Sequence, residues 1–245
     1  MNQKIKQTIK LSGFVVACVR AARAAQMDVR RLFWTLRRGG IVRAYLAAHP
    51  LRKLQIGASH TPYPGWLNTD YIPERSDVVY LDATRPFPIP DASFDYVAFE
   101  HMIEHVDYAG GMAMLQECHR ILKPGGKIRF ATPDLRVLVT LIDPQPTPEA
   151  KKYTDFFIRR LMPQVDQCCG VFILNNAFRF WGHQFLYDRA TLELAMARAG
   201  FTDLRWCRPG ESEDPQLRGI ESHQQCYDVE GINDFETMVI EARKK

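Results

Sequence analysis

Residues 100–105 form the densest group of titratable side chains in the sequence. They read Glu-His-Met-Ile-Glu-His, so Glu100 and Glu104 are four residues apart, as are His101 and His105. On a helix, this spacing places each pair on one face. Two such imidazoles could bind a metal ion, but the sequence suggests no third ligand, so we predict no metal site. Neutral histidine is suited to accepting a proton near pH 7, and a general base is the preferred interpretation.

We predict that His101 is this base, with His183 and His223 as alternatives. One or both imidazoles of the cluster could instead be structural, with His105 packing in the helix while His101 faces a pocket. If the His101 and His105 side chains both face the pocket, we predict that His105 binds the substrate.

A second group, residues 178–183, mixes aromatic rings with a cation and an imidazole. Aromatic faces can receive a sulfonium or a sugar ring, and Arg179 could hold a phosphate or carboxylate. We predict that Arg179 and Trp181 bind the substrate. An aromatic mini-core that ties this segment to the rest of the domain fits the pattern equally well.

Residues 53–70 predict a site for a nucleoside. A buried strand is followed by Gly57, and a second strand ends on Asp70. Glycine lets the backbone approach a ligand closely, and an acid after the second strand can accept hydrogen bonds from ribose hydroxyls. The alternative for Asp70 is a turn or helix cap.

Alternating strands and helices position these groups. The predicted strands are Lys53–Ile56, Trp66–Asp70, Val78–Leu81, Phe94–Phe99, Lys127–Thr132, Asp203–Cys207 and Phe235–Glu241. The predicted helices are 102–107, Gly111–Leu122 and Arg189–Ala199. This βαβ rhythm predicts a parallel sheet with helices on both faces and an antiparallel last strand.

Residues 134–187 interrupt that rhythm with helical pieces at Leu135–Ile142 and Pro148–Met162 and with the aromatic segment. An insert this long usually builds a binding face or a lid. We therefore expect a basic helical extension over residues 1–52 and one domain over residues 53–245 that carries the insert.

The extension is strongly basic. Residues 1–53 contain twelve Lys and Arg residues and one acid, Asp28, so their net charge is +11, whereas the whole chain carries +4. Such an arm suggests an anionic partner. It lacks interleaved aromatic residues for base stacking, so we expect contact between residues 1–38 and an anionic membrane rather than nucleic acid.

The same segment is predicted to be helical, with Gly39-Gly40 ending one helix before a short second one. An apolar face is predicted from the i, i+3, i+4, i+7 spacing of Val29, Leu32, Phe33 and Leu36. Nearer the N-terminus, the apolar stretch Leu11–Val19 is followed at once by Arg20 and Arg23, and we expect this amphipathic helix to pack on the domain or to lie on an anionic membrane surface.

Composition is that of a soluble globular chain. Of the 245 residues, 46% are hydrophobic and 24% charged, and the length suits one large α/β domain with elaborations. The six cysteines show neither metal-ligand spacing nor a disulfide framework. Reduced thiols indicate a cytoplasmic protein, with peripheral attachment at the inner membrane surface as an option.

Four blocks together resemble the class I S-adenosylmethionine-dependent methyltransferases, in particular the type 11 group. The blocks are Leu54–Ser59 with Asp70, Asp82–Asp95, Glu100–His105 and Arg120–Gly126. The resemblance implies a doubly wound, mostly parallel seven-stranded sheet of the Rossmann-like methyltransferase fold. It also implies S-adenosyl-L-methionine as cofactor, and we expect O-methylation of a small-molecule, saccharide or envelope-precursor acceptor.

The resemblance carries over a set of cofactor-binding residues. These are Gly57, Ala58, Ser59, Asp70, Tyr71, Asp82, Ala83 and Glu100. Gly57 and its neighbours would cradle the methionine part, Asp70 the ribose and Asp82 the adenine. Asp82 could instead be a cap with Thr84 nearby.

Two positions depart from the family pattern. Gln55 stands where an acid is usual, and Ser59 stands where a second glycine is usual. Ser59 has a Cβ, so its backbone must avoid positive φ or carry strain. Two alternatives therefore remain, a scaffold subunit that keeps the fold without catalysis and a nucleic-acid-binding protein that uses the basic arm.

Overall fold

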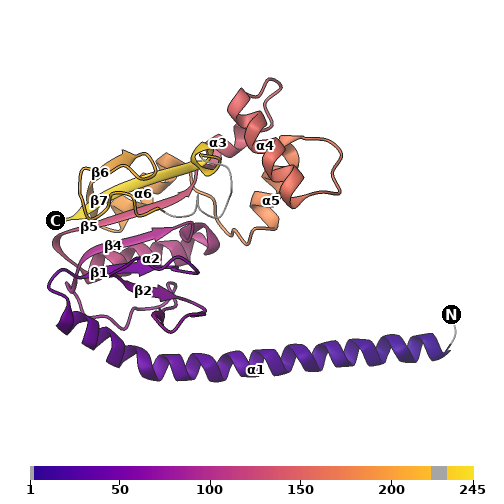
Figure 1. Ribbon diagram of the computed structural model, residues 1–245, viewed down its shortest axis with the longest axis horizontal. Helices are drawn as coiled ribbons and strands as arrows, with labels where there is room; N and C mark the ends of the chain where they lie inside the picture. Colours follow the sequence, from indigo (N-terminus) through magenta and orange to yellow (C-terminus); the bar gives the residue numbers. More distant parts are fainter. Residues whose placement is uncertain (1–2, 222–230) are drawn as a thin grey trace.

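The computed structural model describes residues 3–221 and 231–245 and contains a seven-stranded sheet (Figure 1). The strands are β1 (Lys53–Ile56), β2 (Leu67–Asp70), β3 (Val78–Tyr80), β4 (Phe94–Glu100), β5 (Leu122–Pro133), β6 (Phe201–Cys207) and β7 (Thr237–Lys244). Their order is β3-β2-β1-β4-β5-β7-β6. Strands β1 to β5 are parallel, and β7 runs antiparallel to both β5 and β6. The predicted fold class and the antiparallel last strand are confirmed.

The chain enters the sheet at β1, winds outward to β3 and then returns to place β4 on the other side of β1. Connections leave β1 in opposite directions at this point, which opens a crevice at the carboxyl ends of the strands. The helices are α1 (Gln3–Ala48), α2 (Tyr108–Ile121), α3 (Leu135–Thr140), α4 (Pro148–Leu161), α5 (Gly170–Arg179) and α6 (Arg189–Arg198), with 3-10 turns η1 (Ile103–His105) and η3 (Asn233–Phe235).

The two faces of the sheet are covered differently. Helices α2 and α6 and the end of α1 bury one face in the main apolar core. On the other face, Tyr63, Trp66 and Leu217 pack against Ala98 of β4. These three side chains come from loops. The β1–β2 connection is too short for a helix, and its aromatic residues cover the face instead.

The loop of residues 208–221 is held to this face by buried polar contacts. Asp214 accepts hydrogen bonds from Lys127 Nζ at 2.6 Å and from the Tyr96 hydroxyl at 3.0 Å. Burial favours the neutral acid, but hydrogen bonds from Lys127, from the backbone of Gln216 and from Tyr96 outweigh it. The pKa of Asp214 is therefore lowered.

We expect Asp214→Asn to lower the free energy of unfolding at pH 7 and to have little effect near pH 3. The pKa of this carboxyl is lower in the folded chain than the unfolded value of about 3.9, so its contribution is present above that pH. It is lost as the pH falls through the folded pKa. Denaturant unfolding at both pH values measures this, with the exposed Asp143→Asn as control. Equal destabilisation at both pH values would contradict the ion-pair assignment.

The N-terminal segment is one continuous helix, α1, which extends from the domain as a long rod (Figure 1). The prediction that Gly39-Gly40 ends a helix is wrong, because both glycines lie inside α1. Beyond them, Val42 and Tyr45 are buried in the main core, and the Tyr45 hydroxyl donates to the carbonyl of Lys53 at 3.0 Å. This anchoring outweighs the cost of about 1 kcal/mol per helical glycine.

One face of α1 touches the edge of the sheet and the opposite face is open. Trp34 stacks on Tyr80 of β3 with ring centroids 5.9 Å apart, and Arg31 lies over Tyr71 at 4.8 Å. The predicted apolar face points away from the domain. Its exposed fractions are 68% for Val29, 62% for Leu32, 53% for Phe33 and 75% for Leu36. This face therefore does not pack on the domain, and Val15, Val16 and Val19 of the Leu11–Val19 stretch are exposed as well.

The five cysteines that the structure describes are free, as predicted. Cys118 lies on the buried face of α2 in the main core, whereas Cys168 and Cys169, adjacent to each other in the sequence, are exposed. Cys226 lies outside the described residues.

Candidate functional site

The Gly57 loop and Asp70 meet at the carboxyl ends of β1 and β2. Gly57 has φ +71°, and a Cβ at this position would lie 2.9 Å from Cγ of Met102. Asp70 accepts the N–H of Ser59 at 2.9 Å on one oxygen and the N–H of Ile72 at 2.8 Å on the other. A carboxylate has about four lone-pair sites, so Asp70 keeps acceptors for ribose hydroxyls.

Ser59 adopts φ +43°, the left-handed conformation that glycine favours. A serine here could either avoid positive φ or carry backbone strain, and the structure shows the strained conformation. This conformation costs a non-glycine residue about 1–2 kcal/mol. The bond from its N–H to Asp70 helps to hold the strained backbone in place. The departure therefore preserves the loop shape that a second glycine would give.

Gln55, the other departure, shapes the same loop from below. Its side chain is buried, donates to the carbonyl of Thr61 at 3.1 Å and accepts the N–H of Tyr63 at 2.9 Å. An amide can both donate and accept, whereas an ionised carboxylate only accepts. Glutamine therefore satisfies two backbone groups that an acid could not satisfy together.

We expect Gln55→Glu to reduce the free energy of unfolding at pH 7 by about 1–3 kcal/mol, because a buried carboxylate would face the Thr61 carbonyl. Chemical denaturation measures this loss. Gln216→Glu is the matched control, because Gln216 accepts from Lys53 Nζ and a carboxylate there gains charge assistance. An unchanged Gln55→Glu protein would show that this amide does not hold the loop.

The remaining predicted cofactor residues lie outside this loop. The Asp82 carboxylate accepts the N–H and hydroxyl of Thr84 at 3.0 and 2.7 Å, so it caps a turn as the alternative proposed. Ala83 is buried, and Tyr71 is 43% exposed beneath Arg31. Tyr71, Asp82 and Ala83 do not line the cavity described next.

A cavity of about 670 Å³ opens beside the Gly57 loop. Gly57 and Ser59 of the loop and Glu100 of β4 line it. Phe157 of α4 and Trp181 of the insert line it as well. The insert helices α3, α4 and α5 lie together beyond the ends of the strands (Figure 1), so the insert completes the cavity. This volume is typical of a small-molecule site.

The aromatic segment divides between the cavity and the solvent. Trp181 lines the cavity and packs against Phe157, with ring centroids 5.7 Å apart. Phe178 and Phe180 are 50% and 75% exposed, and Arg179 is exposed. Arg179 does not line the cavity, so the structure gives no support to its predicted contact with the substrate.

The Glu-His-Met-Ile-Glu-His cluster is not a helix, and the prediction of one over 102–107 is wrong. Glu100 ends β4, His101 has φ +46°, and only the 3-10 turn η1 follows. The i, i+4 face assumed from the spacing does not exist, because the parallel strand β5 keeps residues up to Glu100 extended.

His101 is held by protein groups on both ring nitrogens. Nδ1 lies 3.1 Å from Oε1 of Glu104, and Nε2 lies 3.2 Å from the Thr237 hydroxyl. Burial alone would lower the pKa of His101, but the Glu104 carboxylate raises it. This geometry favours a role for His101 in orienting Glu104 and disfavours its predicted role as general base. His105 is exposed rather than packed in a helix, which reverses the arrangement that the structural alternative predicted.

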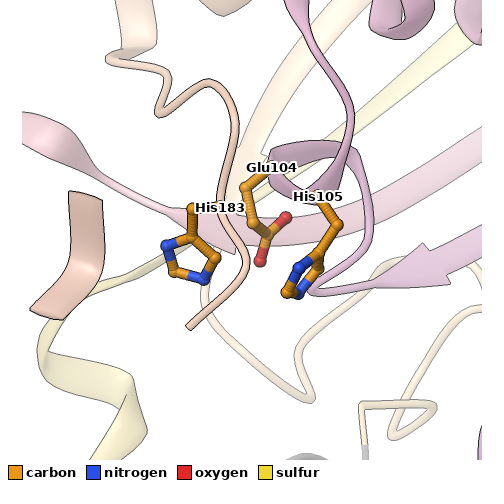
Figure 2. Close-up of side chains that lie close together, drawn as sticks. All are labelled: Glu104, His105 and His183. Atoms are coloured by element: carbon orange, nitrogen blue, oxygen red, sulfur yellow. The ribbon is translucent and has the colours of Figure 1, made fainter. Parts of the chain in front are cut away.

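Glu104, His105 and His183 come together at the insert end of the cavity (Figure 2). One ligand atom from each lies within 4.8 Å of the others. Burial lowers the pKa of His183, opposed by the Glu104 carboxylate, so its ring is neutral at pH 7. Sequence reasoning named His183 as an alternative base but gave no sign that it lies beside Glu104, about 80 residues away along the chain. His223 lies outside the described residues.

Part of the chain is similar in sequence to known proteins. Residues 56–130 match a family model described as a methyltransferase domain. The demethylmenaquinone methyltransferases of two Staphylococcus epidermidis strains are 31% identical over 136 residues, which are 54% of this chain and 49% of each relative. The chain thus spans about half the length of these curated relatives.

Among solved structures, a SAM-dependent methyltransferase from Archaeoglobus fulgidus has a TM-score of 0.50 and 20% sequence identity. The match covers 88% of this chain and 94% of that one. At this level of identity the likeness shows a shared fold.

Proposed function

We propose that this chain, whose residues 56–130 match a methyltransferase domain, is a class I S-adenosylmethionine-dependent methyltransferase that transfers the methyl group of S-adenosylmethionine to an oxygen of a small-molecule acceptor. The observation that carries the proposal is that a place for the adenosyl group and a cavity for an acceptor lie next to each other. The Gly57 loop and Asp70 form a place for the adenosyl group, and a cavity with titratable side chains begins beside the same loop.

The residues of the crevice fit the cofactor. A Cβ at Gly57 would fill the space next to Met102, so this glycine keeps the loop open for a close ligand. The Asp70 carboxylate is fixed by two backbone N–H groups and is ready to accept hydrogen bonds from ribose hydroxyls. Glu100, at the end of β4, lines the cavity where the cofactor and acceptor portions would join.

S-adenosylmethionine supplies an electrophilic methyl group on a positively charged sulfur. The acceptor oxygen forms a bond to the methyl carbon as the carbon–sulfur bond breaks, and the acceptor loses its hydroxyl proton. The chain contributes mainly by positioning: the loop and Asp70 fix one reactant, and the insert encloses the other. His183 is neutral and offers a lone pair at the acceptor end, which can take up a proton or bind a cation.

For the acceptor we propose a hydroxylated small molecule, with a saccharide or envelope precursor as the preferred class. Trp181 offers an aromatic surface for a sugar ring, and Glu100 and Glu104 offer carboxylate acceptors for hydroxyl groups. The relatives named for demethylmenaquinone act on another small molecule, which supports only the size class.

The test is transfer of isotope-labelled methyl from S-adenosylmethionine to components of a cell extract, followed by identification of the labelled product. We expect a labelled small molecule that is stable to protease and nuclease. Calorimetric titration with S-adenosylmethionine runs in parallel. Binding without transfer, or neither, would favour the non-catalytic scaffold, and a labelled nucleic acid would overturn the acceptor class.

We also propose that the open face of α1 rests on an anionic membrane. Val29, Leu32, Phe33 and Leu36 form an exposed apolar stripe, and basic residues such as Arg30 and Arg37 flank it. Apolar area and positive charge on one helix together suit an anionic bilayer surface. None of the described helices is both long enough and apolar enough to cross a bilayer. Attachment would place the protein at the inner membrane surface.

Sedimentation with phosphatidylglycerol vesicles tests this contact. We expect binding that weakens with added salt and is largely lost in the double variant Leu32→Ser, Leu36→Ser. Arg85→Ser, at an exposed site in the domain, is the control. Equal binding by the double variant would contradict the proposed face.

A further inference from the structure

We propose that Glu104, His105 and His183 bind a divalent transition-metal ion at the acceptor end of the cavity. The role of this ion in catalysis rests on the proposed function, whereas the presence of the metal site does not. Two imidazoles and a carboxylate are ligands that suit Zn²⁺ and related first-row ions, whereas Mg²⁺ prefers oxygen ligands alone.

Hydrogen bonds to the backbone hold these three residues close together. Gln184 and Phe185 donate their N–H groups to the carbonyl of Glu104 at 2.7 and 3.3 Å, and the Gln184 side chain donates to the carbonyl of His105 at 2.7 Å. These bonds fasten the last part of the insert to η1. Gly182 has φ +83°, and a Cβ there would lie 3.4 Å from Nδ1 of His105, so a glycine permits this close approach.

The carboxylate has the support that a metal ligand needs. Glu104 is fully buried, and its two oxygens are held by His101 at 3.1 Å and by the Thr132 hydroxyl at 2.9 Å. Such outer contacts fix the direction of a ligating carboxylate and are regular features of metal sites. They also explain why the cluster uses His101 as a supporting group rather than as a ligand.

The two imidazoles are able to complete the site. Their ring centroids are 5.0 Å apart at 72°, and the His183 ring is partly buried and lines the cavity. Ligand atoms around one Zn²⁺ lie about 3.4 Å apart, and the present spread of 4.8 Å closes by rotation of the exposed His105 side chain. Figure 2 shows both rings directed toward the Glu104 carboxylate.

Three protein ligands leave coordination positions open, as catalytic metal sites require. The cluster lines the cavity, so these positions face the acceptor. We therefore expect an acceptor that binds the ion through a hydroxyl oxygen. The bound ion lowers the pKa of that hydroxyl, so the hydroxyl loses its proton more easily.

The test is calorimetric titration of the tag-free, chelator-treated full chain with Zn²⁺, with Mg²⁺ as a second probe. We expect one Zn²⁺ per chain and weaker binding of Mg²⁺ by at least about 100-fold. His183→Ala and His105→Ala should each weaken Zn²⁺ binding by about 10- to 100-fold or more. His49→Ala, a histidine at the end of α1 and away from the cavity, should leave it unchanged. Circular dichroism and S-adenosylmethionine affinity confirm that the variants keep the fold.

No stoichiometric Zn²⁺ binding, or equal weakening by His49→Ala and His183→Ala, would overturn the metal site. Zn²⁺ binding without S-adenosylmethionine binding would sustain the site and refute the proposed function. Replacement by Co²⁺ gives a second readout, since a visible absorption band that His183→Ala removes reports direct coordination.

Discussion

Replacement of Asp70 by alanine should lower the affinity for S-adenosylhomocysteine by about 100-fold. Two hydrogen bonds from ribose hydroxyls to an ionised carboxylate contribute about 1.5–3 kcal/mol each, part of which the free protein recovers by hydration. The variant also releases the N–H groups of Ser59 and Ile72, so the loop that cradles the methionine part becomes less ordered. Calorimetry of the product complex measures the affinity without turnover.

A comparison of ligands separates the ribose contact from the loop. The wild-type chain should prefer S-adenosylhomocysteine over its 2′,3′-dideoxy analogue, and Asp70→Ala should bind the two almost equally. Asp77→Ala, at an exposed carboxylate that pairs with Arg75, is the control and should keep the wild-type preference. A preference that persists in Asp70→Ala would show that the ribose lies elsewhere.

Replacement of Arg129 by methionine should produce the largest loss of stability, about 3–5 kcal/mol. The Arg129 side chain is fully buried and lies 2.6 Å from Oε1 of both Glu221 and Glu241. It also donates to the carbonyl of Arg208 at 3.3 Å. Methionine fills a similar space but leaves two carboxylates without their cation, and the 208–221 loop loses its attachment to β5.

Chemical denaturation measures this effect, and the triple variant Arg129→Met, Glu221→Gln, Glu241→Gln supplies the internal check. Removing both acids as well should restore much of the stability, because the cost lies in unpaired buried charge. Arg205→Met removes a surface pair with Glu213 and should leave the unfolding curve almost unchanged. A small effect of Arg129→Met, similar to that of Arg205→Met, would contradict the role assigned to the buried network.

The sheet could be predicted because its signals are local. Most strands contain a short apolar segment near turn residues, and all seven predicted strands overlap an observed one. The Gly57 loop and Asp70 could also be predicted to meet, since both follow strands that pair in parallel. Errors arose where tertiary contacts outweigh local preference. The buried Tyr45 carries α1 through Gly39-Gly40, and pairing with β5 keeps Glu100 extended rather than helical.

The acceptor site was harder to predict because its members are distant in sequence. Spacing within residues 100–105 paired His101 with His105, whereas the fold pairs His101 with Glu104 and brings His183 across from the insert. His183 lies near Glu104 because Gln184 donates hydrogen bonds to the backbone carbonyls of the η1 turn. No local sequence pattern predicts these hydrogen bonds. Arg179 shows the converse case, since a residue type suited to binding is exposed and does not line the cavity.

The most direct measurement of the central claim is a crystal structure of the chain with S-adenosylhomocysteine. We expect ribose hydroxyls on the Asp70 carboxylate, the homocysteine part along the Gly57 loop and the sulfur directed into the cavity beside Glu100. Ligand bound at another surface, or a Gly57 loop that closes over an empty crevice at saturating ligand, would contradict it.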